Sequence, residues 1–135
     1  MNVAINTENI SKSYPGVLAN SDVSIQINTS SIHAIVGENG AGKSTLMKIL
    51  YGMIKPDSGS IEIFNETANM SSPKDSIALG IGMVHQHFML AKNLTVLENI
   101  ILGIDRPSLK NLGLKKYKKE IEQVMKNYSL DIDLN

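Results

Sequence analysis

Eight residues in the first third of the chain, Gly37 to Ser44, form the pattern Gly-x-x-x-x-Gly-Lys-Ser. A loop that wraps a polyphosphate must turn its backbone N–H groups inward, and glycine permits the backbone angles and the close approach that side chains obstruct. The Lys43 ammonium suits the β- and γ-phosphates, and the Ser44 hydroxyl can ligate a magnesium ion that keeps several waters. The pattern therefore predicts a site for a nucleoside triphosphate and Mg²⁺.

The residues around this loop indicate how it is positioned. Residues 32–36 are a short apolar run, which predicts a buried strand leading into the loop. After the loop, Leu46, Ile49 and Leu50 recur at helical spacing, and Gly52 is placed to end that helix. A helix that begins at the loop directs unpaired N–H groups and the positive end of its dipole at the same anion. The alternative, a glycine-rich turn that merely joins a strand to a helix, lacks a reason for the lysine and serine.

The predicted nucleotide contacts extend over the whole loop and the first helical turn. They comprise Gly37, Asn39, Gly40, Ala41, Gly42, Lys43, Ser44 and Thr45. Thr45 lies one residue further round and could reach the α-phosphate. Spacing alone assigns no chemistry to Glu38 or to Asn39, because the pattern leaves both positions open.

Composition limits the class of protein. The 135 residues suit one domain, and the content of 42% apolar and 19% charged residues is that of an ordinary globular protein. The 13 basic and 13 acidic side chains cancel, so net charge recruits neither nucleic acid nor an anionic membrane. The absence of cysteine excludes a disulfide scaffold and a thiolate metal site. No window reaches the length of a membrane span, which predicts a soluble chain whose membrane role would come through a partner.

Other segments predict a strand-rich first part. Residues 3–10 and 23–27 alternate apolar and polar side chains, as half-buried strands do, around a type II turn at Tyr14-Pro15-Gly16. Turn residues at 55–59 precede an alternating strand at 60–64. Three further segments complete this part: a surface excursion at residues 65–74, a short helix at 77–79 and a buried strand at 81–84.

The last third predicts helices. Residues 95–102 read as a short helix with Thr95 or Asn93 near its start. A second helix places six apolar side chains on one face and a cluster of lysines and glutamates on the other; the apolar set is Leu114, Tyr117, Ile121, Val124, Met125 and Tyr128. The charged face is most simply a solvated surface rather than a phosphate or membrane contact.

With the phosphate loop in place, three stretches resemble the ATP-binding subunits of ABC transporters over essentially the whole chain. They are Gly37-Glu-Asn-Gly-Ala-Gly-Lys-Ser-Thr-Leu-Met-Lys48, the turn Pro56-Asp-Ser-Gly59, and Met83-Val-His-Gln-His-Phe-Met-Leu90 followed by Leu94-Thr-Val-Leu-Glu-Asn-Ile100. The last two are most similar to importers for nucleosides and simple sugars. The resemblance implies an α/β P-loop nucleotide-binding domain with an N-terminal antiparallel β portion. Residues 1–93 would hold the β portion and the phosphate-binding core, and residues 94–135 the start of a helical subdomain.

The resemblance also implies roles for single residues. Tyr14 matches the aromatic residue that stacks on adenine, although a turn tyrosine that covers the sheet edge is an ordinary alternative. Gln86 matches the glutamine that approaches magnesium and the attacking water, so the catalytic candidates are Lys43 and Gln86 and the metal candidates Ser44 and Gln86. His85 and His87 flank Gln86, but two histidines without a third ligand make a poor zinc site.

The family's signature stretch of the LSGGQ type, its Asp-Glu strand end and its switch histidine do not occur in the 135 residues. The sequence is therefore interpreted as the N-terminal part of a longer subunit that binds ATP without hydrolysing it when alone. Loss of later strands would leave residues 32–36 or 81–84 uncovered, and the fragment is expected to self-associate.

The intact protein is expected to hydrolyse ATP on the cytoplasmic face of the membrane and to energise nucleoside or sugar import. Its partners would be a membrane permease subunit and a second ATP-binding domain. Three alternatives remain open at this point: a soluble ABC ATPase without a transport role, a nucleotide-binding fragment without turnover, and a P-loop protein that prefers GTP.

Overall fold

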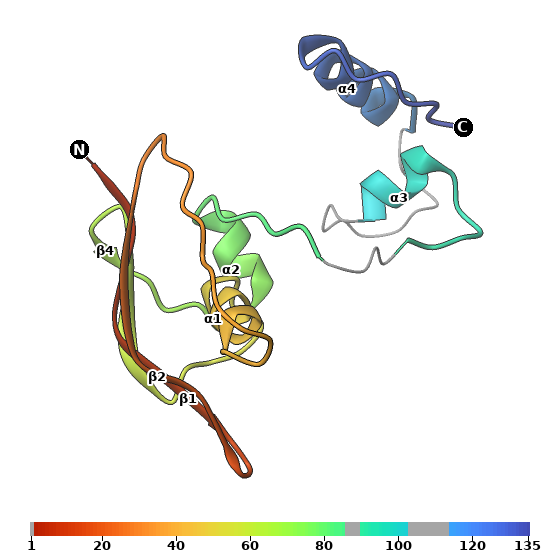
Figure 1. The fold of residues 1–135 in the computed structure, drawn as a ribbon. Coiled ribbons are helices and arrows are strands. Elements are labelled where there is room, and N and C mark those ends of the chain that lie inside the picture. The colour runs from red at the N-terminus through yellow and green to blue at the C-terminus, as the bar shows by residue number, and fades with distance from the viewer. Residues whose placement is uncertain (1, 86–89, 103–113) are drawn as a thin grey trace. The chain divides into compact units, whose positions relative to one another are not determined.

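The computed structural model describes residues 2–85, 90–102 and 114–135. Two compact units divide the chain, Met1–Val84 and His85–Asn135. All sheet structure in the described residues lies in the first unit, and the second consists of helices and their connections (Figure 1).

Four antiparallel strands form the sheet of the first unit: β1 (Val3–Tyr14), β2 (Val17–Asn28), β3 (Ser58–Ile63) and β4 (Glu66–Thr67), in the order β2-β1-β3-β4. The strands predicted from alternation are thus confirmed, and β1 continues to the turn. Tyr14 pairs with Val17 across a two-residue connection. Gly16 has a φ of 79°, which a type II turn requires at its third position.

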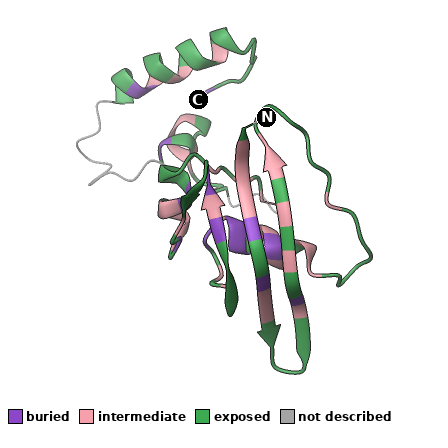
Figure 2. Cartoon of the chain, turned by 90° about the vertical axis from the view of Figure 1, so that its left-hand side faces the viewer, coloured by how far each residue is buried: buried purple, intermediate pink, exposed green. Residues whose placement is uncertain are grey.

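Helix α1 (Lys43–Leu50) packs on one face of this sheet, as the sequence predicts (Figure 1). Leu46, Ile49 and Leu50 are buried, and they form the core together with Ile10, Ile61, Ile63 and Met70 (Figure 2). The helix ends where Gly52 adopts a φ of 71°. A side chain there would collide with the Ser72 carbonyl, so this glycine lets α1 and the segment before α2 approach closely.

Helix α2 (Pro73–Ala78) begins four residues before the short helix predicted at 77–79. Proline at its first position and the Asp75 carboxylate explain the earlier start, because Asp75 accepts hydrogen bonds from the Ser71 and Ser72 N–H groups at 2.9 Å each. These bonds and that from the Ser72 hydroxyl hold the pKa of Asp75 below its ordinary value. The prediction of a surface excursion over 65–74 is partly wrong, since Met70 is buried in the core.

Two predicted strands are absent. Residues 32–36 and 81–84 have no strand assignment, and Ile32, Val36 and Val84 expose 102%, 87% and 89% of their surface. A strand in a parallel sheet needs neighbours on both edges for its backbone groups and layers on both faces for its side chains. The described part of the chain pairs no strand with either segment, so Ile32, Val36 and Val84 lie uncovered, while Ile35 and Ile81 pack partly against the core.

The second unit contains α3 (Val96–Leu102) and α4 (Leu114–Asn127). Thr95 caps α3: its hydroxyl accepts a hydrogen bond from the Glu98 N–H at 3.2 Å, while the Glu98 carboxylate accepts one from the Thr95 N–H at 2.8 Å. In α4 only Tyr117 of the predicted apolar face is buried. None of the helices in the described ranges is both long and apolar enough to span a bilayer.

Candidate nucleotide-binding site

The predicted phosphate loop connects an exposed segment to α1. Gly40 and Gly42 have φ values of 88° and 82°, in the left-handed region that glycine enters without steric cost. Between them the Ala41 N–H donates to the Glu38 carbonyl at 3.2 Å, which tightens the loop into a turn. The pattern of glycines in the sequence therefore corresponds to a backbone requirement at two positions.

The N-terminus of α1 opens directly at this loop. Gly42 precedes the helix without a side chain that could cap it, and the first helical hydrogen bond runs from the Leu46 N–H to the Gly42 carbonyl at 2.9 Å. The amides of Lys43, Ser44 and Thr45 come before that bond, so they have no partner within the helix. Free N–H groups and the positive helix end make a favourable environment for an anion.

The Lys43 side chain forms hydrogen bonds within the loop. Its ammonium donates to the carbonyls of Gly37 and Glu38, both at 2.7 Å. The side chain is half-buried, while Ser44 next to it is exposed. Lys43 thus places a cation against the first two carbonyls of the loop.

Strand β2 holds the other side of the loop. Asn20, buried to 6% exposure, donates from Nδ2 to the Gly42 carbonyl at 3.3 Å. A Cβ atom added to Gly42 would collide with the Ala19 carbonyl and lie 2.8 Å from Asn20 Nδ2. The backbone of β2 and the end of the loop are therefore in close contact, which only glycine at position 42 allows.

Tyr14 lies at the end of β1 and is 40% exposed. The Lys12 ammonium is 5.9 Å from the centroid of its ring, within the range of a cation–π interaction. Tyr14 pairs with Val17 of β2, and Ala19 lies two residues, or about 7 Å, further along that strand. The Ala19 carbonyl lies against Gly42 of the loop. Tyr14 and the phosphate loop therefore belong to the same end of the sheet.

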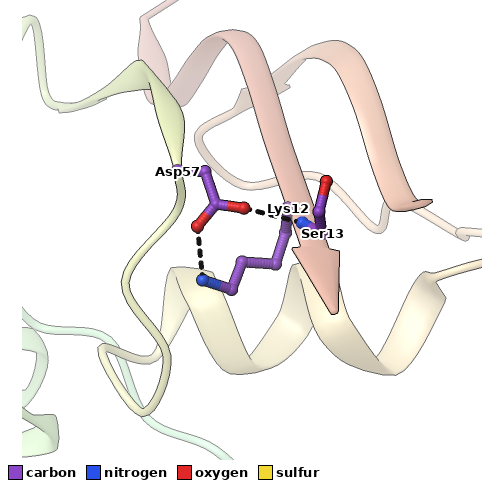
Figure 3. A network of polar contacts seen from close by, with 3 residues as sticks. All are labelled: Lys12, Ser13 and Asp57. Carbon is purple, nitrogen blue, oxygen red and sulfur yellow. Dashed lines mark hydrogen bonds and ion pairs between the residues drawn. The ribbon is translucent and has the colours of Figure 1, made fainter. Parts of the chain in front are cut away.

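Asp57 fixes the end of β1 just before Tyr14 (Figure 3). Its carboxylate accepts from the Lys12 ammonium at 2.6 Å and from the Ser13 N–H at 2.7 Å. Its own N–H donates to the Ser11 carbonyl at 2.9 Å. The Lys12 hydrogen bond, followed by that of Ser13, holds the pKa of Asp57 below its ordinary value. The turn before β3 is thus fastened to the strand that carries the aromatic ring.

The first unit holds the predicted loop residues together with Lys43, Ser44 and Thr45 at the start of α1; their contacts with a nucleotide stay a prediction. Gln86, the remaining candidate, and its neighbour His87 lie outside the described residues. Sequence reasoning missed two contributors, Asn20 and Asp57. Nothing in the sequence marked Asn20, which lies before the strand predicted at residues 23–27; Asp57 looked like ordinary turn chemistry.

Comparison with known proteins identifies the class. A family model described as ABC transporter matches residues 20–134. The guanosine import ATP-binding protein NupO of Bacillus subtilis is 43% identical over 98% of this chain and 26% of its own length. The ribose import ATP-binding protein RbsA of Hahella chejuensis is 40% identical over the whole chain and 27% of its own. The chain thus spans about a quarter of these relatives.

A solved structure agrees with the sequence relatives. A nucleotide-free ATP-binding cassette from an ABC transporter superposes with a TM-score of 0.77 at 29% identity, over 95% of this chain and 55% of its own. The chain therefore belongs to the ABC transporter family and carries part of its ATP-binding cassette. The ABC ATPase fold expected from the sequence is confirmed.

The residues present fit the nucleotide that this family implies. Gly40 and Gly42 keep the loop free of side chains, the N-terminus of α1 is uncapped, and Lys43 supplies the cation, so a polyphosphate finds both donors and charge. The exposed Ser44 hydroxyl gives one oxygen ligand, which suits a magnesium ion that takes its other ligands from phosphate and water.

Proposed function

We propose that residues 37–45 bind the phosphates of Mg-ATP. The observation that carries this proposal is the uncapped N-terminus of α1, which follows a glycine loop whose first two carbonyls bind the Lys43 ammonium. Backbone N–H groups at a helix N-terminus bind anions because both their hydrogen-bonding capacity and the helix dipole favour negative charge. The contact residues are the set named from the sequence, which comprises Gly37 and residues 39–45.

Each side chain of the site then has a distinct task. The Lys43 ammonium leaves the carbonyls of Gly37 and Glu38 and donates instead to the β- and γ-phosphate oxygens. The new hydrogen bonds are stronger because the ammonium and the phosphate are both charged. Ser44 offers its hydroxyl to magnesium, which when bound neutralises charge on the phosphates. Tyr14 stacks on adenine, and since Lys12 stands over its ring, the base takes the opposite face.

In the intact protein we assign this site to ATP hydrolysis that drives import of a nucleoside or sugar. NupO and RbsA, which import guanosine and ribose by their names, support that substrate class. Gln86 would stand near magnesium and the attacking water, residues from about 94 onward would begin a helical subdomain, and the partners would be a membrane permease and a second ATP-binding domain. The protein would then act at the cytoplasmic face of the membrane.

Titration with Mg-ATP tests the binding site. In the wild-type chain we expect the amide signals of residues 37–45 to shift. Lys43→Ala is expected to weaken Mg-ATP binding about 100-fold, since charge-assisted hydrogen bonds to phosphate are lost. Lys48→Ala is the matched control: Lys48 lies on the same helix, exposed and one turn further on, and its loss should change the Kd less than twofold. Unmoved loop amides at saturating Mg-ATP would refute the site.

Phosphate release tests the wider proposal. The 135 residues alone should release none above the Lys43→Ala background, whereas the full-length protein assembled with its membrane partner should hydrolyse ATP and be stimulated by a nucleoside or a sugar. Competition between ATP and GTP decides the base preference. Hydrolysis that is indifferent to any membrane partner would instead support a soluble ABC ATPase.

A further inference from the structure

Asn20 is unusual among the buried polar side chains of the first unit. Thr7 uses its hydroxyl to accept from the Ile25 N–H at 3.0 Å, and the Ser76 hydroxyl contacts the Met70 sulfur at 3.1 Å. Asn20, by contrast, satisfies only its donor, and its Oδ1 atom has no hydrogen-bond partner among the described residues. A buried acceptor without a partner destabilises a fold, whereas an apolar side chain of similar size would fill the same space without that cost. The amide donor is therefore the part of the Asn20 side chain that the fold uses.

The partner of that donor is the last carbonyl before α1. Gly42 O accepts from Asn20 Nδ2 at 3.3 Å and from the Leu46 N–H at 2.9 Å. Because the peptide group is planar and trans, fixing the Gly42 carbonyl also fixes the direction of the Lys43 N–H, which points the opposite way in the same plane. Asn20 thus acts on the first free amide of the helix without touching the phosphate position itself.

Close backbone contact makes this arrangement specific to β2. No Cβ fits at Gly42 because of the Ala19 carbonyl, so the loop reaches the strand at the residue next to Asn20. Gly42 also has a φ of 82°. Because glycine has no Cβ atom, its backbone can adopt other φ and ψ angles at little cost. A residue with that freedom needs an external hydrogen bond to hold one orientation, and the Asn20 amide provides it.

We infer that Asn20 is a positioning residue for the phosphate-binding loop, which aims the Lys43 N–H at the bound anion by holding the Gly42 carbonyl. This inference rests on the proposed function, because it assigns Asn20 to the same Mg-ATP site. It adds a residue from β2 that the glycine-lysine pattern does not contain.

Three variants in the full chain test the inference. Asn20→Leu removes the donor while keeping the branching and the number of heavy atoms, and Asn20→Asp keeps the shape while facing the carbonyl with a carboxylate. Asn6→Leu is the matched control, since Asn6 in β1 also donates one side-chain hydrogen bond, to Glu62 at 3.0 Å, but lies elsewhere on the sheet. Each variant is measured for the Kd of Mg-ATP, for Tm without nucleotide, and for the shift of the Lys43 amide signal on saturation with Mg-ATP.

We expect Asn20→Leu to weaken Mg-ATP about tenfold, the value of one well-placed hydrogen bond, and Asn20→Asp to weaken it more. The Lys43 amide should shift less in both, while Asn6→Leu should lower Tm without changing the Kd or that signal. Wild-type Kd values for both Asn20 variants, or an equal loss of affinity in Asn6→Leu, would overturn the role of Asn20 and leave the binding site standing. A wild-type chain that ignores Mg-ATP would overturn both proposals.

Discussion

The two sides of the phosphate loop differ in how they are held. After the loop, α1 buries Leu46 and Ile49 against the sheet, and Gly42 is fastened to β2. Before the loop, residues 32–36 are also largely apolar, yet Ile32 and Val36 are almost fully exposed and Ile35 alone packs partly against the core. The site is therefore positioned from its helical side, by α1 and by β2.

The difference arises from where each element finds its hydrogen bonds. A helix satisfies most of its backbone groups internally, so α1 needs only one apolar face to pack. A strand must borrow its partners from neighbours, and no strand in the described residues lies beside residues 32–36. Apolar sequence alone thus suffices for α1 and does not suffice for a buried parallel strand.

The largest expected effect comes from Gly42→Ala on the helical side. The new Cβ would collide with the Ala19 carbonyl, and alanine would also have to adopt a positive φ. We expect a loss of at least about 3 kcal/mol in the free energy of unfolding and no detectable Mg-ATP binding. Gly40→Ala is the control, because its φ is also positive but nothing lies near its Cβ, so only about 1–2 kcal/mol should be lost. Urea unfolding that ranks the two equally would break the comparison.

Core truncation compares the two sides directly. Ile49→Ala in α1 removes a side chain that is 1% exposed, and it should cost about 2–5 kcal/mol of unfolding free energy. Val36→Ala removes apolar atoms that are already in solvent, so its effect should stay within about 0.5 kcal/mol. A large loss for Val36→Ala would mean that the segment before the loop is covered in solution.

Self-association sharpens the same comparison. The exposed side chains of Ile32, Val36 and Val84 are apolar and lie on segments without paired strands, so they favour contacts between copies of the chain. Light scattering should show mass rising with concentration, and the double variant Ile32→Ser, Val36→Ser should reduce that rise severalfold. The exposed Ile77→Ser on α2 is the control and should have little effect. A wild-type chain that stays monomeric at high concentration would contradict the expectation.

The smallest effect concerns pH and the Asp57 contacts. Lys12 and Ser13 lower the pKa of Asp57 in the folded chain, so its contribution is present above the ordinary value of 3.8 and is lost as pH falls through the lower folded pKa. Asp57→Asn should lower Tm by a degree or two at pH 7, about what an exposed ion pair supplies, and the difference from wild type should shrink at a pH well below 3.8. Asp131→Asn, in the chain's exposed end, should leave Tm unchanged at both values. A difference that persists in acid would point to a cause other than the Asp57 charge.

Sequence reasoning succeeded where local rules decide the structure. The glycine-lysine pattern, the helical spacing of Leu46 and Ile49 and the Pro-Gly turn each predict their element, because capping, periodicity and turn angles act over a few residues. It failed for residues 32–36, whose state depends on distant strands. Asn20 could not be assigned either, since its partner Gly42 is 22 residues away and only the packing of loop on sheet brings them together.

The two hydrogen bonds from Lys43 to its own loop set a threshold for what the site accepts. A visiting anion must outcompete the carbonyls of Gly37 and Glu38 before the ammonium turns to it. Chloride or acetate brings a single charge to that competition. A chain of phosphates brings several charges at once, so at the proposed site the lysine would favour a polyphosphate over singly charged anions.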